Sequence, residues 1–224
     1  MVVLATKVYV KGESRRRAMD SLESLVQNDL GGLDVEFTVG LRDDQFPSVT
    51  ITGEDAPVAR NLLKEEWGAI TPHRESGETY VGTLESWDDD GFVLDAGESI
   101  RIPTDGLGLG QGTPAQVRRR FGLVQHMPLR FIQGENGEPN RLADTELDRL
   151  YEWTRGNSRV NANSTTRAQI RATVNRSGHA EDIVTVERLG LLEGSIICRE
   201  DTDAPGLLSD IGPYLEAELL AVVP

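Results

Sequence analysis

Two short polar segments divide the hydrophobic pattern of this chain into three stretches, and this division limits the size of any single core. Residues 71–77 contain Pro72 and Gly77, and residues 134–139 contain two glycines and one proline. Glycine and proline within polar runs are typical of linkers and turns. A chain of 224 residues is long for one compact unit and suits two or three. We therefore expect an α+β protein of three small modules, over residues 1–70, 78–134 and 140–224.

The first module alternates between strand and helix patterns. Apolar residues alternate along 4–10 and along 35–41, as in half-buried strands, and a stretch with helical spacing lies between them. A polar turn and a returning strand over 43–51 predict a hairpin. A second helix follows Asp55, with Pro57 in its first turn. The order β-α-β-β-α favours a ferredoxin-like N-terminal module.

The second module is rich in short strand patterns joined by tight turns at 90–91 and 96–97. Thr113 followed by Pro114 predicts the start of one helix inserted among the strands. Short strands with tight turns favour a small β-barrel of the OB or SH3-like kind. The predicted strands cover residues 80–84, 92–95, 100–102 and 129–132.

The third module again mixes helix and strand patterns, so we expect a C-terminal α+β module. Helical spacing predicts a helix over 167–176, capped by Ser164 or Thr165. The other predicted elements are helices over 144–154 and 207–215, and strands over 160–163, 183–186, 195–198 and 219–223.

The balance of charged residues indicates the habitat of the protein. The formal net charge is −14, and the chain has only three lysines against twenty arginines. Abundant acid with almost no lysine is typical of proteins that work in molar salt. Charges there are screened within about 3 Å, so net charge is a weak guide to partners. We interpret the composition as halophilic, and the strand pattern over 1–10 and the single cysteine favour a cytoplasmic protein.

Two segments of this acidic chain contain no acid at all. Residues 106–134 and 153–180 lack Asp and Glu but carry arginines, and the region 101–176 has a net charge of +5. Arginine suits phosphate because its planar guanidinium offers paired donors. We therefore expect these segments to contact phosphates, unless they face acids elsewhere in the fold. The candidate residues are Arg118, Arg119, Arg120, Arg130, Arg159, Asn161, Asn163, Arg167, Arg171, Arg176 and His179.

A glycine-rich loop precedes the first arginine cluster. Gly108, Gly110 and Gly112 alternate with other residues and lead into Thr113, where a helix begins. Backbone N–H groups of such a loop and the helix N-terminus could hold an anion. The loop matches neither the P-loop nor the dinucleotide fingerprint. The alternative is that the glycines serve only the geometry of a turn.

The pattern of reactive residues does not predict a catalytic centre. The three histidines stand far apart without ligand spacing, so we expect no metal site and no cofactor. Cys198 follows an apolar run and is expected to be a buried thiol. We expect Phe92, Phe121 and Phe131 in the core and Trp87 on the surface.

Three phrases of the sequence carry a family resemblance. They are Gly-Phe-Val-Leu-Asp-Ala-Gly at 91–97, Arg-Phe-Gly-Leu-Val-Gln-His at 120–126, and Gly-His-Ala-Glu-Asp-Ile-Val-Thr-Val-Glu-Arg-Leu-Gly at 178–190. The chain resembles the archaeal family called domain of unknown function 2110, in its salt-loving branch, over most of its length. The resemblance implies an archaeal cytosolic protein and no particular activity.

We therefore expect a protein that binds RNA or a ribonucleoprotein through its two acid-free segments. RNA ranks above DNA by analogy with small barrels joined to α+β modules, which is an argument from fold alone. One alternative is an adaptor that docks on acidic protein partners. A second is an enzyme that acts on a phosphorylated small molecule at the glycine-rich loop. No apolar run approaches the roughly 20 residues of a membrane span, so we expect no membrane partner.

Overall fold

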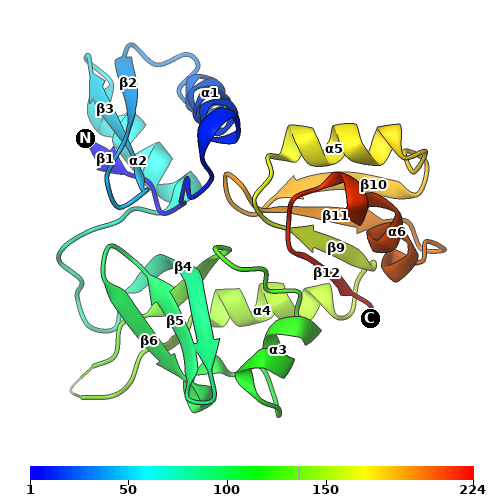
Figure 1. The fold of residues 1–224 in the computed structure, drawn as a ribbon. Coiled ribbons are helices and arrows are strands. Elements are labelled where there is room, and N and C mark those ends of the chain that lie inside the picture. The colour runs from blue at the N-terminus through cyan, green and yellow to red at the C-terminus, as the bar shows by residue number, and fades with distance from the viewer. Residues whose placement is uncertain (136) are drawn as a thin grey trace.

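The computed structural model describes residues 1–135 and 137–224 and has a mixed α+β architecture. The described residues form three antiparallel sheets and six α-helices, which confirms the expected α+β class. Figure 1 shows the sheets in three groups: the first in blue and cyan, the second in green, and the third in yellow to red. No helix in the described part of the chain is long and apolar enough to cross a bilayer.

The N-terminal module packs two helices on one face of a three-stranded sheet. The sheet has the order β1-β3-β2, and the predicted hairpin is confirmed by the pairing of Phe37 with Ile51. Val49 and Ile51 are buried with Leu22 and Leu63 from the two helices. The elements are β1 (Val2–Val3), α1 (Gly12–Asp29), β2 (Glu36–Leu41), β3 (Pro47–Thr52) and α2 (Ala56–Trp67).

The first strand is shorter than its alternating pattern predicts. Beyond Val3, Leu4 adds only an isolated bridge to Ala69. The next residues leave the sheet because their polar groups bind the other modules. Thr6 Oγ1 accepts a hydrogen bond from the N–H of Leu191, and Lys7 forms ion pairs with two carboxylates of the central module. Alternation alone could not reveal these distant partners.

The central module is an open, curled sheet rather than a closed barrel. Its strand order is β6-β5-β4-β7-β8, and the two edge strands β6 and β8 form no ladder with each other among the described residues, so the sheet is a half-barrel. The Asn140 side chain bridges the two edges by donating to Arg101 O over 3.1 Å. The strands are β4 (Thr79–Asp88), β5 (Gly91–Asp95), β6 (Ser99–Pro103), β7 (Pro128–Ile132) and β8 (Arg141–Leu142).

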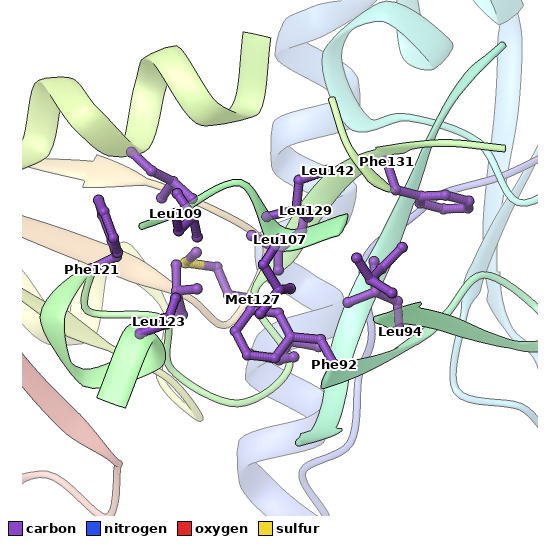
Figure 2. Packing of buried hydrophobic residues seen from close by; sticks show 14 of the residues in the cluster. Phe92, Leu94, Leu107, Leu109, Phe121, Leu123, Met127, Leu129, Phe131 and Leu142 are labelled. Carbon is purple, nitrogen blue, oxygen red and sulfur yellow. The ribbon is translucent and has the colours of Figure 1, made fainter. Parts of the chain in front are cut away.

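The hollow of the half-barrel is filled by apolar side chains, several of which Figure 2 shows from close by. Phe92, Phe121 and Phe131 are buried there as expected. Trp87, expected on the surface, is instead half-buried at the edge of this core, because Arg118 covers its ring. The core also receives side chains from the short helix η1 (Thr104–Leu107), from α3 (Pro114–Arg120) and from α4 (Asp144–Trp153).

Helices α3 and α4 differ in how well the sequence places them. Thr113 caps α3 in a capping box, in which Thr113 Oγ1 accepts from Gln116 N and Gln116 Oε1 accepts from Thr113 N, as the Thr-Pro signal predicts. The sequence groups α4 with the third module. Its buried residues Leu150 and Trp153 instead pack in the central core, because the linker at 134–139 is followed by strand β8, which extends the central sheet.

The C-terminal module is a four-stranded sheet with two helices, in the order β10-β11-β9-β12. Helix α5 starts where the sequence predicts, but its cap is Thr166 rather than Ser164 or Thr165, and Gln169 completes a capping box. The elements are β9 (Arg159–Ala162), α5 (Arg167–Arg176), β10 (Ile183–Arg188), β11 (Gly194–Cys198), α6 (Ala204–Ile211), η2 (Gly212–Tyr214) and β12 (Leu219–Val222).

Side chains along strand β9 point alternately to the two faces of the C-terminal sheet. Each face packs against one of the two helices that carry predicted site residues, α3 and α5. Val160 and Ala162 of β9 pack in one core with Ile170 and Val174 of α5. Asn161 points to the other face, where its side chain donates to Gly122 O just after α3. Helices α3 and α5 therefore lie on opposite faces of this sheet, as Figure 1 also shows.

A buried polar network joins the three modules at the segment that follows β1. Tyr9 Oη donates to Glu193 Oε1 over 2.7 Å and accepts from the N–H of Ser164 over 2.8 Å. The Tyr9 ring packs on His126 with 3.9 Å between ring centroids. Ser164 and His126 have φ angles of 57° and 68°. Such left-handed conformations in non-glycine residues persist where the surroundings fix them, so this junction is tightly determined.

Candidate polyanion-binding groove

Arg118, the first residue of the predicted arginine cluster, points into the protein. Its Nη1 donates to Leu123 O over 2.8 Å, and its Nη2 pairs with Glu218 over 2.7 Å. The guanidinium also stacks on Trp87, 3.8 Å from the ring centroid. These contacts tie α3 to the segment before β12 and leave Arg118 little surface for a ligand.

The glycine-rich loop is occupied by a side chain of its own module. Arg120 donates to Gln111 O over 2.9 Å and to Leu109 O over 2.5 Å. The loop therefore turns carbonyl groups toward a cation, and the N–H of Thr113 is bound by the capping box. Gly108, Gly110 and Gly112 all have positive φ angles, which only glycine adopts readily, so turn geometry accounts for the three glycines.

The two candidate asparagines and the candidate histidine also have partners. Asn161 is fully buried against Gly122, and Asn163 donates to Gln125 O over 3.1 Å, so both join the C-terminal module to the central one. His179 lies between two carboxylates, with Nδ1 2.7 Å from Asp182 and Nε2 3.1 Å from Asp210.

Three candidate arginines are exposed and form no ion pair within the part of the chain that the structure describes. They are Arg119 on α3 and Arg171 and Arg176 on α5. Because α3 and α5 lie on opposite faces of the C-terminal sheet, these arginines do not form one surface.

The remaining candidates, Arg130, Arg159 and Arg167, meet in a groove between the modules. Two adjoining clefts, of about 600 and 610 Å³, share the lining residues Glu66, Arg149, Arg188 and Leu189. We call these two clefts together the arginine groove. All three modules contribute to its walls, which carry five arginines: Arg130, Arg149, Arg159, Arg167 and Arg188.

Indole rings support three of these guanidinium groups. Arg149 and Arg159 both lie over Trp153, at 5.0 and 4.6 Å from the ring centroid. Arg188 lies over Trp67 at 3.9 Å. A cation held against an aromatic face is attracted by the ring without being neutralised. Each of the three also pairs with a carboxylate, Arg149 with Glu146, Arg159 with Glu187 and Arg188 with Glu66, so the rings fix the positions of guanidinium groups that are partly neutralised.

Arg159 is the most buried of the five arginines, and its Nη1 donates to Ser195 Oγ over 3.3 Å. Its side chain is only 10% exposed, and the carboxylate it faces, that of Glu187, lies 3.6 Å away and is 52% exposed. The buried Nε has no hydrogen-bond partner among the described residues. Burial lowers the pKa of the Arg159 guanidinium, and although Glu187 opposes this, the charge of Arg149 lowers it further. An anion in the groove would relieve both effects.

The groove has a net positive lining in an otherwise acidic protein. Glu146 lies fully buried beneath it and is bound by both Arg130, at 3.5 Å, and Arg149. Even so, basic side chains along the two clefts outnumber acidic ones. The basic ones are Lys64, Arg130, Arg149, Arg159, Arg167 and Arg188, and the acidic ones are Glu65, Glu66, Glu152 and Glu187.

Sequence reasoning missed Arg149 and Arg188 because both have acidic neighbours along the chain. Asp148 precedes Arg149, and Glu187 precedes Arg188. The available signal was Trp153, four residues after Arg149 and therefore on the same helix face. No comparable local signal marks Arg188, whose indole partner Trp67 belongs to another module.

The described residues contain no cluster of three or more histidine, cysteine or acidic side chains arranged to hold a metal. Cys198 is buried, and burial raises the pKa of its thiol to about 11, so it is not ionised at neutral pH.

Comparison with known families accounts for nearly the whole chain. The DUF2110 N-terminal domain matches residues 1–73, the DUF2110 central domain matches residues 74–154, and the DUF2110 C-terminal domain matches residues 157–223. The central match includes α4, which packs on the half-barrel. No curated protein matches the chain.

Proposed function

The chain belongs to the DUF2110 family, and we propose that this protein binds single-stranded RNA in the arginine groove. The supporting observation is the pair Arg149 and Arg159, two guanidinium groups on one indole ring, of which Arg159 is buried with an unpartnered Nε. Two like charges held together in a cleft are stabilised by a bound anion. Phosphate is the anion that arginine forks match best.

A single strand suits this groove better than a duplex. The two clefts adjoin and are each about 600 Å³, in the range of small-ligand sites, so a flexible strand enters them more readily than a rigid duplex. A nucleic-acid backbone can follow the two clefts and place successive phosphates on Arg130, Arg188 and Arg167. Unstacked bases can lie on guanidinium planes as well as on aromatic rings. RNA is preferred to DNA by analogy with the half-barrel and α+β architecture.

The two acid-free segments contribute unequally to this proposal. Arg130, Arg159 and Arg167 line the groove, whereas Arg119 and Arg171 are exposed outside it. This difference supplies an experiment in which Arg130, Arg167, Arg119 and Arg171, all exposed, each lose one charge. Arg130 also binds the buried Glu146, so the stability of both double variants is measured beside their affinity. The groove pair is Arg130 and Arg167, and the control pair is Arg119 and Arg171.

The experiment measures binding of a fluorescent single-stranded RNA by anisotropy, in KCl from about 0.2 M to 2 M. We expect Arg130→Gln with Arg167→Gln to weaken binding by roughly tenfold or more, since two charge-assisted hydrogen bonds are lost. Arg119→Gln with Arg171→Gln should change affinity by less than about threefold, although the net charge changes equally. Equal losses in both pairs would show non-specific attraction and contradict the groove.

A second test works in cells, by ultraviolet crosslinking at native salt followed by recovery of the protein and sequencing of attached RNA. The proposal predicts discrete RNA that the groove pair removes and the control pair retains. Complexes that survive nuclease and contain an acidic protein would instead support an adaptor that docks on acidic partners.

We also propose a fold relationship for the first two modules and a habitat for the protein. The order β1-β3-β2, with Leu4 bridged to Ala69 where a fourth strand would stand, supports a ferredoxin-like N-terminal module. The curled five-stranded sheet supports a relation to OB or SH3-like barrels. Three lysines in a chain of net charge −14 support a halophilic archaeal protein of the cytoplasm.

A further inference from the structure

We infer that a separate cleft between α1 and α5 binds a phosphorylated small molecule. This cleft has a volume of about 680 Å³ and lies between the N-terminal and C-terminal modules. It shares no lining residue with the arginine groove. Its volume is in the range of small-ligand sites.

Three cationic side chains converge on this cleft from two modules. Lys11 and Arg17 come from the start of α1, and Arg176 comes from the end of α5. Glu216 is the one acid in the lining. Among the described residues, Lys11 and Arg176 form no ion pair, and Arg17 has only Glu13, at 3.7 Å. This local excess of positive charge attracts an anion with more than one negative charge.

A mostly buried threonine in the wall has a hydroxyl group without a partner among the described residues. Thr173 is 4% exposed and lines the cleft from α5. Its side chain forms no hydrogen bond with any residue that the structure describes. Buried hydroxyls are normally hydrogen-bonded, so this one is available to a ligand oxygen.

Another part of the wall is held in a fixed shape. Ser164 lines the cleft with a φ of 57°, and its N–H is bound by Tyr9, another lining residue. Left-handed conformations of this kind cluster at ligand sites. Helix α1 also begins at this cleft without a side-chain cap, so its first N–H groups add donors beside Lys11 and Arg17.

The test is isothermal titration of the full chain with inorganic pyrophosphate, at constant ionic strength set with KCl. We expect a saturable site that depends on this cleft, besides any binding of pyrophosphate in the arginine groove. Arg176→Gln should weaken binding by roughly tenfold, because a charge-assisted hydrogen bond is lost. Thr173→Val, which keeps shape and charge, should weaken it by roughly threefold to tenfold.

Two controls separate this cleft from other basic surfaces. Arg199→Gln removes the same charge from an exposed position outside the cleft and should leave the pyrophosphate affinity unchanged. Arg130→Gln with Arg167→Gln should also leave the affinity of this cleft unchanged, whatever those variants do to RNA binding. The inference is overturned if no saturable site is found. It is also overturned if Arg199→Gln weakens pyrophosphate binding as much as Arg176→Gln does, or if only the groove variants abolish that binding.

Discussion

Tyr9 donates its hydroxyl hydrogen to Glu193 across 2.7 Å, although the two residues are 184 positions apart. Glu193 is fully buried, and its Oε2 has no hydrogen-bond partner among the described residues. Burial raises the pKa of this carboxyl to about 8. The N-terminal segment is therefore held to the C-terminal sheet by a carboxyl group that stays protonated at neutral pH.

Glu193 makes the stability of the protein depend on pH. The folded state keeps a proton that the unfolded chain releases above its ordinary pKa of 4.5. The free energy of unfolding should therefore fall by a few kcal/mol as pH rises from about 5 through 8. Glu193→Gln keeps the neutral shape and should remove this slope. Urea titrations at several pH values and constant KCl measure the free energy of unfolding. If it changes with pH equally in the wild-type protein and in Glu193→Gln, the prediction is wrong.

Lys7 forms ion pairs with two carboxylates at the same junction, with Nζ 2.9 Å from Glu85 and 2.7 Å from Asp95. Burial opposes ionisation of Glu85, but hydrogen bonds from His126 and Lys7 outweigh it and lower the pKa of Glu85 to about 2. Lys7→Met should cost about 3 kcal/mol, because it leaves two partly buried negative charges together. Lys64→Met, at an exposed position, is the control, and chemical denaturation near pH 7 is the measurement. If Lys7→Met and Lys64→Met lower the free energy of unfolding equally, the ion pairs of Lys7 do not stabilise the fold.

Gly122 lies where α3 meets the C-terminal sheet. Its φ is +65°, and a Cβ there would lie 2.5 Å from Val222 Cγ2 and 2.9 Å from Asn161 Nδ2. Gly122→Ala should lower stability by about 3 kcal/mol, from backbone strain and overpacking together. Gly178→Ala has a comparable φ of +86° with no atom within 4 Å, so it should lose only about 1 kcal/mol. Thermal denaturation of both variants checks the difference, and similar losses would exclude a packing role.

Salt should stabilise the folded protein. The net charge of −14 makes the compact state repel itself at low ionic strength, and KCl screens this repulsion. We expect the midpoint of thermal unfolding to rise by roughly 10 °C or more between 0.2 M and 2 M KCl. Differential scanning calorimetry checks this, and a midpoint that does not change would contradict adaptation to high salt.

Local patterns predicted most of the secondary structure. Helix α5 is amphipathic over 167–176 and matches its prediction in extent. The hairpin of β2 and β3 and the capped start of α3 also follow from periodicity and turn chemistry. These signals work because each depends on residues within a few positions of one another. Thr6 and Lys7 leave the first sheet because they bind residues of other modules. The local pattern does not contain these long-range contacts, so it predicts too long a strand.

The sequence by itself determined the α+β class, the helices and most strands, and the unequal distribution of acids. Only the tertiary structure decided which arginines meet. Arg118 lies in an acid-free segment, yet its carboxylate partner is Glu218, 100 residues away. Arg149 and Arg188 have acidic neighbours in sequence, yet they line the basic groove. The physical reason is that periodicity reports the few residues along one turn or strand, whereas a charge is neutralised by whatever the fold brings within a few ångströms of it.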